Sequence, residues 1–517
     1  MGLQAPLAAT TLTHVIEKGG VIVLALAVAA ILSLPPRLGR RLRSPLIVAA
    51  LLLTPVLLAV ALWHNSKLAP LHHHPLEGIA AIVAALLIIA ALAHLLDRRP
   101  ALLPLLAIAA LPFRIPLGTI SDGLLVPLYA VIAAGSICHL ARTWSHPQSE
   151  VCEEGRESGL PQHLLSAYLL LYAIQASYST GLTKAVEQLG FFYVPFALLF
   201  FLLCGERWDR VLLERCLWLI GSLAMLFVLV GFAELASGRL LFNRSLDADA
   251  YFVRINSLFY DPNIYGRFLA LTMIVVTVAL LFTRRRRAAQ LAAGALALMW
   301  AGLALSLSQS SVVALLAGLA VAAVGVWGRR AAAVVAVLTV LGVAGALAIA
   351  LHSNNSANDL TSGRSSLVRG GIDLFADRPL AGYGSGSFST EYLAHLPKHR
   401  NSFERRWQLP VALPATTDSH TTAITIAAEQ GLVGLALYAA LLIACFARLF
   451  GGRLFAPLRS PEGIARLAVA AAFTGLVVHT LFYADFLEDP TTWVLLAVVV
   501  ALAPRRASPL PTATAPS

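Results

Sequence analysis

The residues best suited to chemistry lie in a polar stretch from His352 to Asp418 and in the segment directly after it. There, Thr-Thr-Asp-Ser-His-Thr-Thr places His420 just ahead of a long apolar run. We expect Asp418 or Ser419 to cap a membrane helix, with His420 in its first turn. A helix N-terminus disfavours the imidazolium form, so His420 is a candidate general base, with a structural or solvated histidine as the alternative.

Arginines on both sides of this stretch are candidates for binding an anion, because a guanidinium can donate two parallel hydrogen bonds to phosphoryl oxygens. Arg364 and Arg369 belong to a predicted short amphipathic helix inside the polar stretch. Arg254 lies upstream, shortly before Asp-Pro-Asn at 261–263. Pro262 fits the start of a helix that would carry Asn263 and Arg267 in its first turn. For Arg267, snorkelling at the membrane interface is as plausible as anion binding.

A glycine-rich segment, Pro-Leu-Ala-Gly-Tyr-Gly-Ser-Gly-Ser-Phe at 379–388, follows the predicted short helix. We expect a tight turn; a phosphate cradle is the weaker alternative, because the Lys-Ser/Thr of a P-loop is absent. Glu429 falls nine residues after His420, on the opposite helix face and deeper. We expect its carboxylate to be buried and bonded to neighbouring backbone, and Gly431 and Gly434 to permit close helix packing.

The elements that must position these residues are membrane helices. The chain of 517 residues is 58% hydrophobic and only 13% charged, with a mean hydropathy of +0.77. Long apolar runs without alternating polarity exclude a soluble protein and argue against a β-barrel. We therefore predict an all-α, polytopic bundle with about 12 to 15 spans.

The candidate spans follow the apolar runs. They are 15–34, 45–63, 77–96, 101–113, 123–141, 163–181, 188–204, 211–235, 263–283, 288–305, 311–327, 331–351, 422–447, 465–484 and 490–503. Arginine-rich loops such as 284–287 and 329–330 mark the cytoplasmic side. The loops of the opposite set, including 306–310, 352–421 and 485–489, would then face outward.

This topology divides the chain into N-terminal transmembrane helices (1–351), an extracytoplasmic catalytic loop (352–421), C-terminal transmembrane helices (422–503) and a disordered tail (504–517). The loop carries arginines and lysines on the side where the topology bias disfavours them, which suggests an anionic ligand, although its acidic residues nearly balance them.

The net charge of +11 does not indicate nucleic acid, because the arginines sit in short loops between apolar runs, where they act as topology signals. Two patterns resemble weak metal sites: Asp247 and Asp249, spaced as DxD, and the adjacent His72, His73 and His74. Neither has an evident further ligand, so we expect no metal and no other cofactor.

The motifs of the C-terminal half resemble, in order and spacing, those of the O-antigen ligase and O-antigen polymerase superfamily. They are Arg254 with Asp261-Pro-Asn, Gly363-Arg364, the 379–388 segment, and Ser419-His420 followed by Glu429-x-Gly-x-x-Gly. The resemblance covers about 190 to 250 residues of the C-terminal half. It implies a membrane glycosyltransferase of the GT-C type that takes a glycan from a polyprenyl (undecaprenyl) diphosphate carrier in lipopolysaccharide or polysaccharide biosynthesis. It also implies the bacterial inner (cytoplasmic) membrane, with the active site facing the periplasm or exterior.

By the same resemblance, Arg254 and Arg364 would contact the donor diphosphate and His420 would activate the acceptor hydroxyl, with Asp418, Asn263, Gln309 and Glu429 in support. Many members have Ser-Arg where this chain has Ser308-Gln309. A charged donor contact is therefore missing here or supplied by another residue, such as Arg369.

The residues are consistent with this chemistry on their own terms. Diphosphate is a good leaving group, so arginines and a neutral imidazole suffice without metal, and direct displacement would invert the anomeric centre. A multi-pass transporter or a flippase for lipid-linked sugars is the alternative. A transporter would favour charged residues at mid-membrane, where this chain has few.

Overall fold

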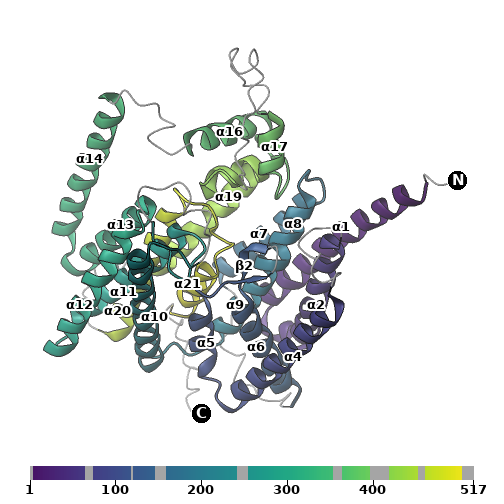
Figure 1. The fold of residues 1–517 in the computed structure, drawn as a ribbon, viewed down its shortest axis with the longest axis horizontal. Helices are drawn as coiled ribbons and strands as arrows, with labels where there is room; N and C mark the ends of the chain where they lie inside the picture. Colours follow the sequence, from purple (N-terminus) through teal and green to yellow (C-terminus); the bar gives the residue numbers. More distant parts are fainter. Residues whose placement is uncertain are drawn as a thin grey trace, which may run out of the picture.

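The computed structural model describes residues 4–63, 74–117, 120–145, 159–241, 254–352, 364–395, 418–451 and 460–502. Within these ranges the chain is almost entirely helical, and its helices pack side by side in one bundle (Figure 1). Eleven of the described helices are long and apolar enough to cross a membrane. The predicted all-α, polytopic architecture is therefore confirmed.

The first part of the bundle contains α1 (Gln4–Ser33), α2 (Pro36–Leu62), α4 (Pro75–Arg98), α5 (Leu102–Ala110), β1 (Ile115–Leu117), β2 (Ile120–Leu124), α6 (Val126–Ser145), α7 (Leu160–Ala176), α8 (Leu182–Gln188), the π-helical turn η3 (Leu189–Tyr193), α9 (Val194–Cys204) and α10 (Arg210–Ser237). The second part contains α11 (Pro262–Phe282), α12 (Arg286–Leu305), α13 (Gln309–Trp327), α14 (Arg329–His352), α16 (Arg364–Asp377), α17 (Phe388–His395), α19 (Thr422–Phe450), α20 (Pro461–His479) and α21 (Pro490–Ala501).

Several predicted spans end in the wrong place. The span expected over 465–484 is helical only to His479, and the one expected over 163–181 only to Ala176. The span expected from residue 123 is preceded by a small antiparallel hairpin, in which β1 pairs with β2. After His479, hydropathy alone produces this error, because the apolar residues 481–484 beside the helix end score like more helix.

Helix starts follow local signals more faithfully. Pro262 occupies the first turn of α11, as predicted, and the Asp261 side chain accepts the Asn263 N–H. The same pairing of an acidic cap with proline recurs at α21, where Asp489 accepts the Thr491 N–H. Proline is tolerated at this position because its missing N–H has no intrahelical partner there.

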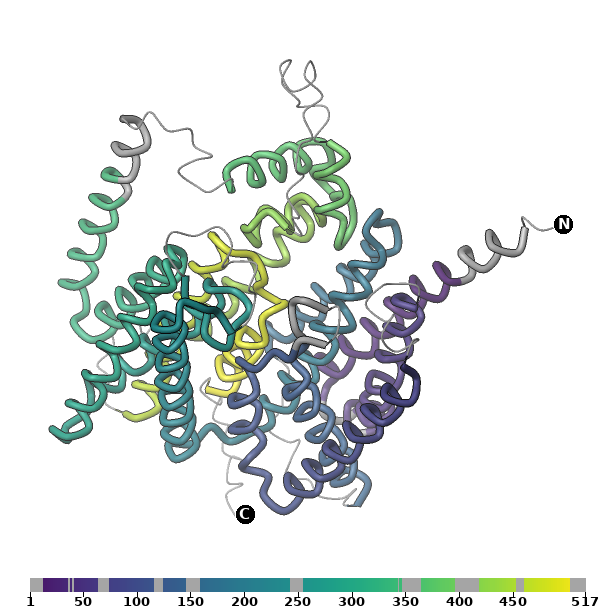
Figure 2. The backbone as a smooth tube through the Cα atoms, in the orientation of Figure 1, coloured from purple at the N-terminus to yellow at the C-terminus, as the bar shows by residue number. Residues whose placement is uncertain are grey.

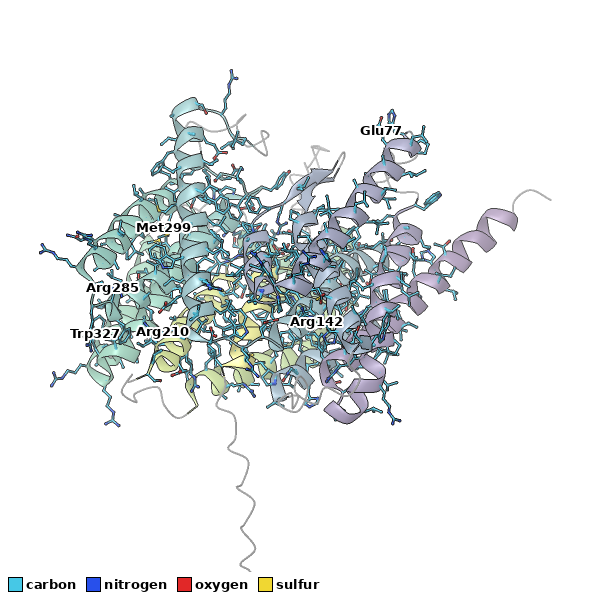
Figure 3. All side chains as sticks on the ribbon, turned by 90° about the horizontal axis from the view of Figure 1, so that it is seen from below. Glu77, Arg142, Arg210, Arg285, Met299 and Trp327 are labelled. Carbon is cyan, nitrogen blue, oxygen red and sulfur yellow. The ribbon has the colours of Figure 1, made fainter. Side chains whose placement is uncertain are left out.

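The bundle surface is apolar. Leu76 and Leu87 of α4 and Leu341 of α14 are among its exposed side chains. Seen from below, Arg285 and Trp327 lie at the rim of the bundle (Figure 3). Exposed leucines around a helical bundle are expected where the surrounding solvent is lipid.

The helices α16 and α17 form a separate layer at one end of the bundle, against α19 (Figure 1). The layer has a small apolar core of its own: Leu367, Leu374, Tyr383, Phe388, Tyr392 and Ala428. The amphipathic helix predicted around Arg364 is thus present as α16. Its residue Ile372 is exposed.

The helix α19 is interrupted at Gly431, which has a φ of +65° and a ψ of −162°. A Cβ atom at this position would lie 2.3 Å from the carbonyl oxygen of Leu380. Gly431 therefore admits the backbone of the glycine-rich segment, and the predicted role in packing one helix on another is wrong. Non-helical backbone at membrane depth is tolerated where protein covers it.

At this interruption the helix and the segment complete each other's hydrogen bonds. The Tyr383 and Gly384 N–H groups donate to carbonyls 428 and 429 of α19, at 3.2 and 2.8 Å. In return, the Leu432 N–H donates to Pro379 O at 2.7 Å. The 379–384 segment is therefore fixed to α19 through backbone atoms on both sides.

Candidate active site

His420 lies in a tight turn before α19, and the prediction that it belongs to the first helical turn is wrong. The helix begins at Thr422, with Thr421 as its cap residue. His420 itself has a φ of +56°, a left-handed conformation that residues other than glycine rarely adopt. The Asp418 carboxylate holds the turn by accepting the His420 N–H at 2.6 Å. The argument from the helix N-terminus therefore does not apply to this imidazole.

The His420 side chain remains accessible and has a carboxylate beside it. Its ring nitrogen Nδ1 lies 3.8 Å from Asp418 Oδ1, and 38% of the side chain is exposed. Ser419, the other predicted cap, is buried, and its hydroxyl pairs with that of Thr425 at 2.9 Å. Asp418 thus orients both the backbone and the ring of His420.

The segment 480–489 between α20 and α21 forms the other wall of the site. The Thr422 N–H donates to Thr480 O at 3.1 Å, and the Thr421 hydroxyl donates to Leu481 O. The ring of Tyr483 lies 6.1 Å from that of His420. In Figure 2 the yellow C-terminal trace runs beside the light-green start of α19.

Arg364 reaches the same segment from the α16 side. Its Nη1 donates to Phe482 O at 3.2 Å, next to the tyrosine that faces His420. The structure therefore brings Arg364 and His420 together on adjacent residues of one loop. Arg369, the predicted substitute cation, is exposed on the same helix.

Arg254 belongs to a neighbouring part of the site. Its Nε donates to Ser306 O at 3.2 Å, in the turn between α12 and α13. Serines of the first turn of α13 extend toward α20: Ser310 and Ser311 both contact His479 Nε2, at 3.2 and 3.3 Å. His479 in turn lies 5.6 Å, ring to ring, from Tyr483. A chain of contacts thus joins the Arg254 region to the wall beside His420.

Asn263 and Gln309 differ in their surroundings. Asn263 is buried, and its Oδ1 accepts the Ser308 hydroxyl at 3.0 Å. Gln309 is the first residue of α13 and is exposed, so an uncharged side chain occupies the position where many relatives of the resembled superfamily carry arginine.

Arg267 does not snorkel. It is 3% exposed, its Nη2 lies 2.8 Å from Asp489 Oδ2, and its guanidinium sits over the Tyr483 ring. Tyr483 also donates to Asp261, the cap of α11. Since Asp489 neutralises it, Arg267 supports the 480–489 segment from beneath and is a structural cation.

Glu429 is buried and bonded to backbone, as predicted. Its two carboxylate oxygens accept the N–H groups of Gly386 and Phe388, at 2.9 and 3.0 Å. Gly382, Gly384 and Gly386 all have positive φ, which makes the segment a succession of tight turns. The N–H groups that a phosphate cradle would require are already used by Glu429, so the tight-turn interpretation holds.

His395 and Glu391, further possible bases in α17, are engaged in other contacts. His395 Nδ1 lies 2.7 Å from Glu391 O, and the Glu391 carboxylate accepts the Thr180 hydroxyl at 2.8 Å. Tyr383 donates to Asp377, and burial together with that carboxylate raises the pKa of Tyr383 to about 12. The Glu391 contact ties α17 to the loop between α7 and α8.

The weak metal patterns fall largely outside the described residues, which exclude Asp247, Asp249, His72 and His73. His74 is described, with its Nδ1 3.6 Å from Glu77. Within the described ranges, no group of three or more histidine, cysteine, aspartate or glutamate side chains is arranged to hold a metal ion.

Sequence reasoning missed the 480–489 segment as part of the site. It treated residues up to 484 as membrane span and the rest as a short outer loop. A signal was present, since Asp485, Glu488 and Asp489 place three carboxyl groups between two apolar runs. Acidic residues at such a junction are costly unless they are paired or functional.

Residues 294–439 match the family model described as O-Antigen ligase. This part of the chain is similar to the O-antigen ligase family. The matched range runs from within α12 to within α19 and includes Gln309, Arg364, Arg369, His420 and Glu429. The match confirms the resemblance to the O-antigen ligase and polymerase superfamily and supports glycan transfer by a multi-pass membrane protein. No curated protein matches the chain.

Arg254, Asn263 and the 480–489 segment lie outside the matched range. The matched range therefore supplies the imidazole and one guanidinium. The flanking helices α11 and α20 bring the remaining groups to it.

Proposed function

We propose that this protein transfers a glycan from a polyprenyl diphosphate carrier to an acceptor hydroxyl, at the outer face of the bacterial inner membrane. The observation that carries the proposal is the meeting of Arg364 and His420 on Phe482 and Tyr483. It supports a mechanism in which a cation for the leaving diphosphate and a base for the attacking hydroxyl act beside one loop.

Arg364 would stabilise the charge that develops on the departing diphosphate. A guanidinium has five N–H donors, and the bond to Phe482 O uses one donor on Nη1. Arg254, held at Ser306, and Arg369, exposed further along α16, are the other proposed donor contacts. Fixed cations at the leaving group favour the transition state over the ground state.

His420 would accept the proton of the acceptor hydroxyl as that oxygen attacks the anomeric carbon. Asp418, 3.8 Å from Nδ1, can orient the ring and stabilise the imidazolium that forms. Attack opposite the leaving group would invert the anomeric centre. The mechanism requires neither metal nor other cofactor.

The test is a transfer assay with purified protein and a lipid diphosphate-linked oligosaccharide. His420→Ala should lower turnover by roughly a hundredfold to ten-thousandfold, the range for a removed general base, with donor binding nearly unchanged. The matched control is His395→Ala, which removes an imidazole of the α17 layer and should keep most of the activity. EDTA should leave the rate unchanged, and the new linkage should have the inverted configuration.

Wild-type turnover in a folded His420→Ala protein would remove the histidine from the mechanism. The same assay separates ligase from polymerase. Products that lengthen when the donor is the only glycan present indicate a polymerase, whereas dependence on a separate lipid or protein acceptor indicates a ligase.

A further inference from the structure

Asp418, whose carboxylate accepts the His420 N–H, also lines a partly open chamber of about 60 Å³. Three more carboxyl side chains line this chamber: Asp485, Glu488 and Glu429. Lys184 of α8 is the one ammonium group on its wall. One water occupies about 10–15 Å³ by this measure, so the chamber has room for roughly four.

Unpaired polar atoms indicate that the chamber holds water. Thr422 and Gln430 both line it, and their side chains are more than nine-tenths buried. Thr422 Oγ1 and Gln430 Oε1 have no hydrogen-bond partner among the described residues. A buried polar atom left without a partner costs about 1–3 kcal/mol, which a bound water removes.

Asp485 and Glu488 both line the chamber and come from the same short segment, three residues apart. Burial, the Glu488 charge and the Asp418 charge raise the pKa of Asp485 well above its usual range, against the opposing charges of Arg267 and Arg114. Two carboxyl groups that share one site cannot both ionise easily.

Glu488 faces a different set of charges. Burial and the Asp418 charge raise the pKa of its carboxyl, and Lys184 opposes this. The Gln188 amide also donates to it. Glu429 completes the wall, with both oxygens held by backbone N–H groups. Asp485 and Glu488 are thus the chamber carboxyls whose pKa the Asp418 charge raises.

We propose that this chamber receives the proton released in each transfer, by way of Asp418. The inference rests on the proposed function. His420 takes the proton from the acceptor hydroxyl, whose oxygen uses the freed electron pair to bond to the anomeric carbon, and the diphosphate leaves with the electrons of the broken bond. The imidazolium gives the proton on Nδ1 to Asp418, and chamber water carries it to the Asp485–Glu488 pair, from which it later reaches bulk water.

Asp485→Asn is the decisive variant. Asp485 has a φ of +81°, which asparagine readily adopts, so the loop conformation should survive. Turnover should fall by about tenfold or more, with the donor KM unchanged, because the proton leaves His420 more slowly. Added imidazole buffer should restore turnover by carrying the proton directly to solvent. Glu488→Gln should behave in the same way, and Glu391→Gln, a carboxyl outside the chamber, should be unaffected.

The pH profile gives a second readout. Activity needs one ionised chamber carboxylate, so it is lost as pH falls through the raised pKa values. Removing the Glu488 charge lowers the pKa of Asp485, and the acid limb of the Glu488→Gln profile should therefore move to lower pH. A structural role would produce neither this shift nor rescue by buffer.

The chamber proposal fails if both variants keep wild-type turnover and pH dependence, or if imidazole does not relieve the loss. Absence of glycan transfer by the wild-type protein would instead overturn the proposed function. The two failures are therefore distinguishable in one set of assays.

Discussion

Replacing Glu429 with alanine should release the glycine-rich segment from α19. The side chain is buried, and its two oxygens are the acceptors of the Gly386 and Phe388 N–H groups, at 2.9 and 3.0 Å. Each N–H left without a partner costs about 1–3 kcal/mol, so the local destabilisation should be about 2–6 kcal/mol. Glu429→Gln should fall between wild type and alanine, because one amide oxygen can accept while its NH₂ group opposes the second donor.

Hydrogen–deuterium exchange measures this loss locally. The Gly386 and Phe388 amides exchange only when the segment opens, and a loss of 2 kcal/mol should speed that exchange by about thirtyfold. The matched control is Glu391→Ala in the same layer, which removes one contact at the exposed Thr180 hydroxyl and should leave both amides slow. A folded Glu429→Ala protein whose 384–390 amides exchange at the wild-type rate would refute the reasoning.

Two further predictions concern the cations of the site. Arg364→Lys should reduce turnover by about ten- to a hundredfold, roughly 1.5–3 kcal/mol, because an ammonium cannot form two parallel bonds to a diphosphate. Arg369 is exposed on the same helix, and Arg369→Lys should reduce turnover less. Equal losses of turnover in the two variants would contradict the assignment of Arg364 as the main donor contact. Arg267→Met should lower stability by about 3–5 kcal/mol, measured by thermal denaturation in detergent, because Asp489 is left charged and buried. The double variant with Asp489→Asn should recover part of that loss, and its failure to do so would deny the pairing.

Local sequence signals predicted much of the site because they act over a few residues. An aspartate followed by proline identified the start of α11 at Pro262. A single glutamate in an apolar run is expected to accept hydrogen bonds from nearby donors, and Glu429 accepts the Gly386 N–H. The polar, turn-rich character of 379–388 predicted tight turns, which three positive-φ glycines supply.

Other features depend on contacts between distant parts of the chain, which no local pattern records. The left-handed turn at His420 exists because Asp418 accepts its N–H and the 480–489 segment meets the residues that follow. Leu481 and Phe482 are as apolar as the helix before them, so hydropathy extended that helix past its end at His479. The chamber joins Lys184 to Glu488 across some three hundred positions in sequence, a proximity that only the folded bundle creates.

The interruption of α19 has a consequence for exchanging parts between relatives of this protein. Backbone N–H groups of 379–384 donate to carbonyl groups of 428–433, and N–H groups of 428–433 donate to carbonyl groups of 379–384. The backbone conformation of each stretch therefore depends on that of the other. A chimaera that imports the loop alone would pair a foreign backbone path with the resident break at Gly431. Grafts that carry both stretches together should fold. The two stretches should therefore be exchanged as one unit, and the loop boundary visible in the sequence is the wrong place to divide the chain.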